Sequence, residues 1–256
     1  MRVLSYIPPP PLADFVELLW LYEGAAPAHA RERLLPTGTT ELVVPLGGDS
    51  WEPVISGPHS ESFVIETAAQ SAIMGVHFRP GGAFPFLDPP AWELHNTNVP
   101  LADVWGRAAV ALHDRLREAK TVADRFRILE QALRARLVRP LMRHPAVTFA
   151  LARFHNGART VADVLDRIGL SQRSFIQRFT DEVGLTPKLF CRIQRFQQVI
   201  DLVQRGPHVQ WANLAVACGY YDQAHFIHDF RAFSGFSPSD YLKARGEHRN
   251  HVPLAD

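Results

Sequence analysis

A ten-residue pattern occurs twice in this chain, fifty residues apart, and it restricts the fold more than any other feature of the sequence. Residues 161–170 (VADVLDRIGL) align with residues 211–220 (WANLAVACGY). Farther along, the second copy has one additional residue, and two phenylalanines of each copy match: Phe175 and Phe179 with Phe226 and Phe230. A repeat at a fixed spacing indicates that one supersecondary unit is present twice.

Each copy has the parts of a helix-turn-helix unit: a short amphipathic helix, a glycine, a polar helix start and a second helix. Gly169 and Gly219 stand where the first helix must end, because a left-handed backbone conformation costs glycine least. Ser171 and Asp222 are favourable N-cap residues for the helices that follow. The phenylalanines, four residues apart, give each of those helices an apolar stripe. The repeat therefore predicts two units: about residues 161–182 and about residues 211–233.

The outward side of each second helix is expected to be polar. Its candidate DNA-binding residues are Gln172, Arg173, Gln177 and Arg178 in the first unit and Gln223, His225 and His228 in the second. Arginine can bond guanine through two donors, and glutamine can bond adenine through a donor and an acceptor. We therefore expect these residues to bind double-stranded DNA. The alternative is a plain helical bundle with a polar exposed side, and two copies in register argue against it.

A single long helix is predicted between the two units, from Pro187 to Gln204. Proline suits the first turn of a helix, and Gly206-Pro207 ends it. At about 1.5 Å per residue this helix is roughly 27 Å long, against roughly 34 Å for one turn of DNA. One chain is thus expected to reach two successive major grooves. Three cations on or near the helix are candidate phosphate contacts, with solvated surface charge as the alternative: Lys188, Arg192 and Arg195.

The first 140 residues differ from the second half in residue composition and in the spacing of apolar residues. Up to about residue 100, short β-branched runs alternate with proline- and glycine-rich turns, as in the strands of a small sheet or barrel. Residues 14–22 fit a helix or a strand. Residues 101–138 have apolar residues at helical spacing, which predicts two helices that pack on the barrel or form a dimer surface. The expected fold class is α+β, with a β-barrel-like domain and flanking helices at residues 1–140, then an all-α domain at residues 141–256.

The charges are distributed unequally between these two parts. Residues 141–256 hold 14 Lys and Arg against 10 Asp and Glu, whereas residues 1–140 hold 13 against 16. A modestly basic half is compatible with a nucleic-acid partner, but the contrast is too small to establish one. The prediction of DNA binding therefore depends on the repeat.

The second half resembles the AraC/XylS family of bacterial transcription regulators. The likeness lies in the tandem units, the long linking helix and the segment 219–231 (GYYDQAHFIHDFR), followed by 235–238 (GFSP) and Tyr241. The resemblance implies a seven-helix domain with a recognition helix of each unit in the major groove. By position it implies base reading by Arg173, Gln177, Gln223 and His228. Many family members have arginine at the positions of Gln177 and His228, so the target sequence does not carry over.

The first half is similar to the effector domain of some of these regulators, through residues 35–43 (LPTGTTELV) and 75–83 (GVHFRPGGA). In the family such domains are barrel-like and either bind a small molecule or mediate dimerisation. The resemblance therefore implies a one-component regulator with a small-molecule effector of unknown identity, a homodimer, or both. It also implies contact with RNA polymerase if the protein is an activator.

Other chemistry has little support in the sequence. Four histidines lie one per segment, without the His-x-His plus Glu grouping of a cupin-type metal site: His29, His59, His77 and His95. Cys191 and Cys218 have no CxxC spacing, so we expect neither a disulfide framework nor a zinc site. No nucleotide-binding glycine pattern or nucleophile motif appears, and no cofactor is expected. The alternative is a barrel that binds a small molecule, or a metal-dependent enzyme, with a helical appendage.

No membrane-spanning or secretory segment is predicted. No window holds the eighteen or more uncharged apolar residues of a membrane helix, and the N-terminus runs directly into Ile7-Pro8-Pro9-Pro10-Pro11. We therefore expect a cytoplasmic protein without a membrane partner.

Overall fold

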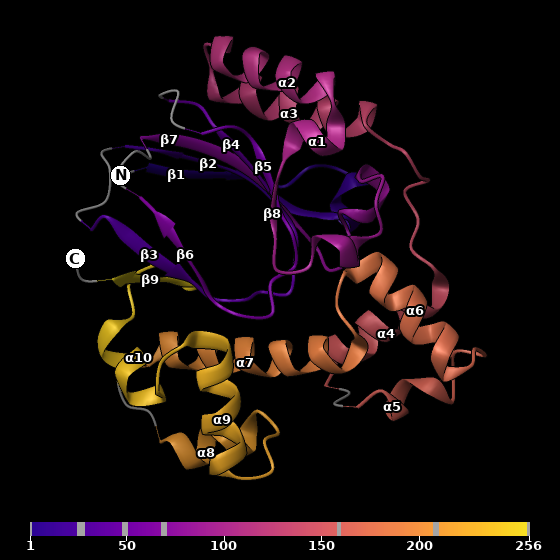
Figure 1. The fold of residues 1–256 in the computed structure, drawn as a ribbon, viewed down its shortest axis with the longest axis vertical. Helices are drawn as coiled ribbons and strands as arrows, with labels where there is room; N and C mark the ends of the chain where they lie inside the picture. The colour runs from indigo at the N-terminus through magenta and orange to yellow at the C-terminus, as the bar shows by residue number, and fades with distance from the viewer. Residues whose placement is uncertain are drawn as a thin grey trace.

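The computed structural model describes residues 2–24, 29–47, 51–67, 71–157, 160–206 and 210–254. The strands form a larger and a smaller β-sheet, and Figure 1 shows helices above the larger sheet and a helical part below the smaller one. The predicted mixture of a β-rich first half and a helical second half is confirmed. Within the described residues, no helix combines the length and the apolar character needed to cross a membrane.

The larger sheet has six antiparallel strands. In spatial order they are β1 (Arg2–Tyr6), β2 (Val16–Glu23), β7 (Ala72–Phe78), β4 (Glu41–Pro45), β5 (Val54–Ser56) and β8 (Asn98–Pro100). A 3₁₀ helix, η1 (Leu12–Asp14), precedes β2, so the ambiguous segment at residues 14–22 is mostly strand. Side chains alternate between the two faces of each strand, and Leu19, Leu42 and Met74 are buried on the face that the helices cover.

The smaller sheet shows that the expected barrel is not closed. Its strands are β6 (Phe63–Glu66), β3 (Arg31–Leu34) and β9 (His251–Leu254). A barrel needs pairing all the way around, whereas among the described residues no strand pairing joins the two sheets. The smaller sheet packs instead against the helical half, through the buried Val252 and through Arg33, which lies over the ring of Phe236. Of the two alternatives, a small sheet or a barrel, the described strands form open antiparallel sheets and not a closed barrel.

Three helices cover the larger sheet: α1 (Leu101–Trp105), α2 (Arg107–Glu118) and α3 (Val122–Ala135). Gly106, with φ at +58°, separates α1 from α2, so the first predicted helix is divided in two. Leu112, Leu116, Leu129 and Leu133 of α2 and α3 are buried in the same core as the sheet residues. Of the two alternatives for these helices, packing on the sheet is observed. Short 3₁₀ helices, η2 (Phe84–Phe86) and η3 (Ala91–Leu94), lie between β7 and β8.

The second half is helical. It consists of α4 (Pro145–His155), α5 (Ala162–Leu165), α6 (Gln172–Val183), α7 (Pro187–Arg205), α8 (Trp211–Ala217), α9 (Gln223–Ser234) and α10 (Pro238–Ala244). One hydrophobic core runs through all of it, with Phe175 and Phe179 of the first unit and Phe226 and Phe230 of the second unit completely buried. The long helix between the units is confirmed as α7.

The two halves are joined by more than the linker near residue 140. The chain end returns to the first half as β9, which pairs antiparallel with β3. Leu35 is part of the helical core, and Gln197 of α7, which is 6% exposed, donates a hydrogen bond to the carbonyl oxygen of Pro36 at 2.8 Å. At the end of α6, a Cβ on Gly184 would lie 2.4 Å from Pro58. Residue 140 thus marks where the chain passes from the first half to the second, but the two halves are in contact through β9, Leu35 and Gln197.

A buried carboxylate stabilises the junction between β3 and β9. Glu32 is 8% exposed and accepts hydrogen bonds from His29 Nε2 at 2.6 Å and His251 Nδ1 at 2.7 Å. Desolvation by itself would raise the pKa of Glu32, but the hydrogen bonds and charges of the two histidines outweigh it and lower the pKa to about 2.

We expect Glu32→Gln to destabilise the protein near neutral pH. A carboxyl group whose pKa is lowered by folding stabilises the protein above its unfolded pKa, and this contribution is lost as the pH falls through the folded value. The difference in unfolding free energy between parent and variant should therefore shrink from about pH 4.3 toward pH 2. Urea denaturation at several pH values measures it, with the exposed Glu118→Gln as control. A constant difference over this range would contradict the role of the Glu32 charge.

Candidate DNA-binding interface

The first helix-turn-helix unit is formed by α5 and α6. Gly169, at the turn, has φ of +63°. The hydroxyl of Ser171 accepts a hydrogen bond from the backbone N–H of Ser174 at 3.2 Å and so caps α6, as predicted. Phe175 and Phe179 face the core, which directs the polar residues of α6 outward. The first helix is shorter than expected, since α5 has only four residues.

The second unit, α8 and α9, repeats this construction. Gly219 has φ of +80°, and the carboxylate of Asp222 accepts a hydrogen bond from the backbone N–H of His225 at 2.7 Å. Phe226 and Phe230 are buried as their counterparts are. Both recognition helices are therefore held by the same local interactions, a cap at the start and aromatic packing on the inner side.

The outer side of α6 carries all four predicted residues in exposed positions: Gln172, Arg173, Gln177 and Arg178. Gln177 Nε2 donates a hydrogen bond to Asp181 Oδ1 at 2.8 Å. This hydrogen bond must break before the Gln177 amide can donate to a base. Among the described residues, Arg173 and Arg178 have no hydrogen-bond or ion-pair partner. These guanidinium groups are therefore free to bind an external acceptor.

The outer side of α9 is less basic, and its predicted residues differ in exposure. Gln223 and His228 are exposed. The ring of His225 instead lies edge-on to Tyr220, with centroids 5.3 Å apart, and its Nε2 is 3.7 Å from Asp229 Oδ2. This histidine is thus partly engaged in packing the unit, and α9 presents fewer free side chains than α6 does.

The three cations of α7 also differ from one another. Lys188 is exposed. Arg195 lies over the ring of Tyr220 at 5.5 Å from its centroid. Arg192 donates to both carboxylate oxygens of Asp229, from Nη2 at 2.7 Å and from Nε at 3.4 Å. Arg192 thus has a partner within the protein, and its contact with a DNA phosphate stays a prediction.

Asp229, which was not among the predicted residues, holds the second recognition helix against α7. Its side chain is 2% exposed. One signal was available, because Asp229 stands three residues after Phe226 and four before Phe233, on the apolar stripe of α9. A carboxylate on a buried stripe requires a partner. Nothing local in the sequence indicates that the partner is Arg192.

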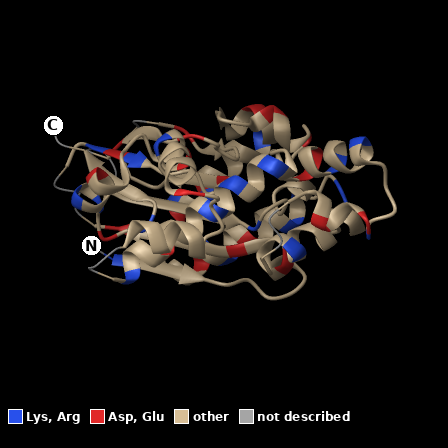
Figure 2. Ribbon diagram, turned by 90° about the horizontal axis from the view of Figure 1, so that it is seen from below, with Lys and Arg blue, Asp and Glu red and all other residues tan. Residues whose placement is uncertain are grey.

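Charge alone does not mark a DNA-binding face. Figure 2, seen from below the view of Figure 1, shows Lys and Arg interspersed with Asp and Glu. The distribution of charged residues along the ribbon therefore does not by itself single out a DNA-binding face. Within the described residues, no three or more His, Cys, Asp and Glu side chains are grouped so that they could hold a metal ion.

Two family models match the chain. Residues 164–244 match a helix-turn-helix domain, and residues 4–100 match a domain of unknown function, DUF6597. The transcriptional regulatory protein HptR of Staphylococcus aureus, in several strains, is 30% identical over 84 residues. This alignment covers 33% of the chain and 32% of HptR, so the chain matches about a third of the length of these relatives.

Solved structures of ToxT from Vibrio cholerae are similar along most of the chain. One has a TM-score of 0.44 at 9% identity and covers 88% of this chain and 93% of ToxT. A second, with ToxT bound to (E)-4-(8-methylnaphthalen-1-yl)but-3-enoic acid, has a TM-score of 0.44 at 10% identity and covers 88% and 94%.

Proposed function

We propose that this chain is a DNA-binding transcription regulator with an AraC-type helix-turn-helix domain in its second half. A single chain is proposed to read a bipartite DNA site, with α6 on one half-site and α9 on the other. The observation that carries the proposal is the pair of identically capped recognition helices joined by α7. Arg173, Arg178 and Gln177 on α6 are proposed as the main base-reading and phosphate-binding residues. Gln223 and His228 on α9 are proposed to read the second half of the site.

The N-terminal part is proposed to make this DNA binding conditional. Its strands and helices contact the DNA-binding half through Leu35, Gln197 and β9. A small molecule or a second chain that binds residues 1–140 would thereby alter the arrangement of the helical half. Contact with RNA polymerase belongs to this proposal if the protein activates transcription.

The proposal is tested with the full chain and a pool of random duplex DNA. We expect selection to enrich one sequence with two half-sites about one helical turn apart, roughly 10 base pairs. Binding should weaken steeply with salt, since phosphate contacts release counterions. Enrichment of no sequence, or of one short half-site only, would contradict bipartite reading by α6 and α9.

We expect Arg173→Ala to change specificity and Lys188→Ala to change affinity alone. Loss of a bidentate contact to guanine costs about 1–3 kcal/mol at that position, so Arg173→Ala should relax the preference at particular bases. Lys188→Ala removes a proposed phosphate contact, so it should weaken binding to all sequences alike. It should also reduce the slope of log affinity against log salt concentration by about 1. Arg107→Ala, on α2, is the matched control. An unchanged selected site with Arg173→Ala would remove Arg173 from the proposed reading residues.

A further inference from the structure

The second helix-turn-helix unit has one residue more than the first, and that residue is Tyr221. Residues 169–171 (GLS) in the first copy correspond to residues 219–222 (GYYD) in the second. Tyr220 packs inward: it is 4% exposed, and its ring centroid lies 5.3 Å from that of Phe226. Tyr221, in contrast, is 91% exposed. The additional ring therefore contributes little to the core of the unit.

Tyr221 stands at the end of α9 that meets DNA in a helix-turn-helix complex. It directly precedes Asp222, the N-cap residue of α9. In such complexes the recognition helix lies in the major groove, and the residues at its N-terminal end contact the edges of the bases. An exposed ring at this place comes within reach of the bases when α9 is in the groove.

The same end of α9 lacks the arginine that α6 has. The two recognition helices align so that Gln172 matches Gln223 and Arg173 matches Ala224. Ala224 is exposed, as Arg173 is. A methyl group cannot bond guanine as a guanidinium group does. Tyr221 and Ala224, three positions apart, thus give the N-terminal end of α9 an apolar surface where α6 has a cation.

An apolar surface in the major groove suits one base in particular. Every base presents hydrogen-bonding groups there, but thymine also presents a C5 methyl group, which alanine and aromatic side chains contact. A tyrosine hydroxyl can instead bond a phosphate, a contact that fixes position and carries no sequence information. Ala224 has no polar side-chain group for a phosphate, so its place beside the ring favours the methyl contact.

We propose that α9 recognises a thymine in the second half-site by its methyl group, which the Tyr221 ring and the Ala224 methyl group contact. The two recognition helices then read different bases, since α6 reads guanine through Arg173 whereas α9 reads thymine by apolar contact. Gln223 and His228 keep the role proposed above. This inference rests on the proposed reading of a bipartite site by one chain.

The test replaces thymine by uracil, one position at a time, in the DNA site that the full chain selects. Deoxyuridine keeps the hydrogen-bonding groups of thymine and lacks only the methyl group. The half-site read by α9 is the one whose sequence preference Arg173→Ala leaves unchanged. There we expect at least one replacement to weaken binding about fourfold, the effect of burying one methyl group. Equal affinity for thymine and uracil at every position of this half-site would overturn the proposal.

Variants assign the methyl contact to the two residues. Tyr221→Ser should weaken binding and bring the affinities for thymine and uracil closer together, whereas Tyr221→Phe keeps the ring and should discriminate as the parent does. Ala224→Arg introduces the residue that α6 has and should shift the preference at this position toward guanine. If Tyr221→Phe weakened binding to all sequences alike and Tyr221→Ser kept the discrimination, the hydroxyl would contact a phosphate and the proposal would be overturned.

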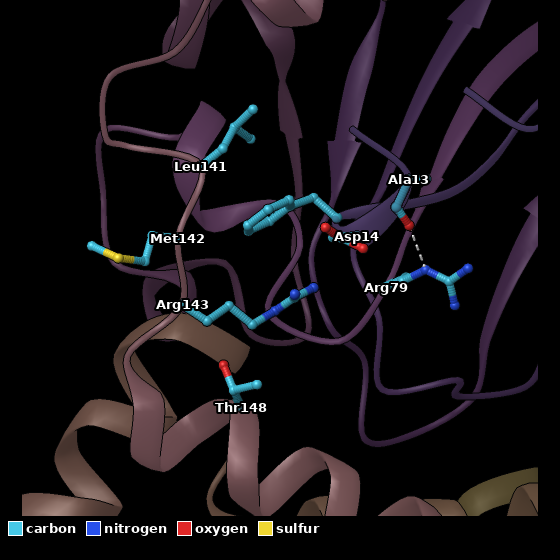
Figure 3. A pocket seen from close by; sticks show the side chains of 8 residues that line it. Ala13, Asp14, Arg79, Leu141, Met142, Arg143 and Thr148 are labelled. Atoms are coloured by element: carbon cyan, nitrogen blue, oxygen red, sulfur yellow. Dashed lines mark hydrogen bonds between the residues drawn. The ribbon is translucent and has the colours of Figure 1, made fainter. Parts of the chain in front are cut away.

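A matched control separates this contact from a general loss of apolar surface. Because its side chain is exposed, Tyr221→Ser should melt within about 2 °C of the parent. Met142 is also apolar and is 68% exposed. It lines a pocket of about 460 Å³ where the two halves of the chain meet, together with Arg79 and Arg143 (Figure 3). Met142→Ala should discriminate thymine from uracil as the parent does, and a loss equal to that of Tyr221→Ser would overturn the assignment.

The outcomes distinguish this inference from the proposed function. Selection of two half-sites, without any dependence on a methyl group in the second, would overturn the thymine contact and leave bipartite reading in place. Enrichment of no sequence, or of one half-site only, would overturn the proposed function and the thymine contact with it.

Discussion

Phe230→Ala is expected to lower the free energy of unfolding by about 3–5 kcal/mol, because the site cannot collapse around the missing ring. Phe230 is completely buried in the core that runs through both helix-turn-helix units. Its ring centroid lies 5.4 Å from that of Phe196, 5.6 Å from that of Phe226 and 5.5 Å from that of Tyr241. Urea denaturation followed by circular dichroism measures the change.

Two variants accompany Phe230→Ala. Phe230→Leu keeps most of the volume and should be destabilised less, since it leaves a smaller cavity. Val110→Ala removes a side chain that is 58% exposed on α2, and it should change stability by at most about 0.5 kcal/mol. A loss below about 1 kcal/mol for Phe230→Ala would mean that the second unit is not packed on α7 as described.

Asp229→Ala is expected to destabilise the protein by about 2–3 kcal/mol and to weaken DNA binding. Removal of one partner of a buried ion pair usually costs about 3–5 kcal/mol, because the other charge stays buried without compensation. Arg192 keeps 31% of its side chain exposed and can recover some hydration, which reduces the cost. The pair joins α9 to α7, so its loss also loosens the second recognition helix. Denaturation and DNA titration measure the two effects.

The exposed Asp114→Ala on α2 is the matched control for Asp229→Ala, with an expected change within about 0.5 kcal/mol. Arg192→Ala should weaken DNA binding as Asp229→Ala does, because each variant removes the ion pair that joins α9 to α7. If Arg192→Ala instead reduced the slope of log affinity against log salt concentration by about 1, without loss of stability, Arg192 would be a phosphate contact as predicted.

The parts of the fold that were predicted correctly depend on residues close together in the chain. The glycines at 169 and 219, the caps Ser171 and Asp222, and the phenylalanines four residues apart act within one or two helical turns. Capping and periodicity are short-range effects, so a sequence displays them directly. For the same reason the exposed side of α6 was identified correctly from its spacing.

The parts that were missed or mistaken depend on residues far apart in the chain. The return of the chain end as β9 and the place of Leu35 in the helical core bring together segments separated by more than a hundred residues. The open arrangement of two sheets likewise pairs strands that do not follow one another in the chain, such as β2 with β7. Short strands carry the same alternating pattern whether they close a barrel or form two sheets. Nothing within a strand indicates its partner.

The sequence by itself thus determined that this chain has two helix-turn-helix units joined by one helix, and which polar residues α6 exposes, because those features follow from local periodicity and capping. Only the tertiary structure decided that Arg192 is held by Asp229, that the halves are joined through β3 and β9, and that Arg79 and Arg143 line one pocket. Each of these depends on long-range packing, where the partner of a charge or a strand is selected by the whole fold.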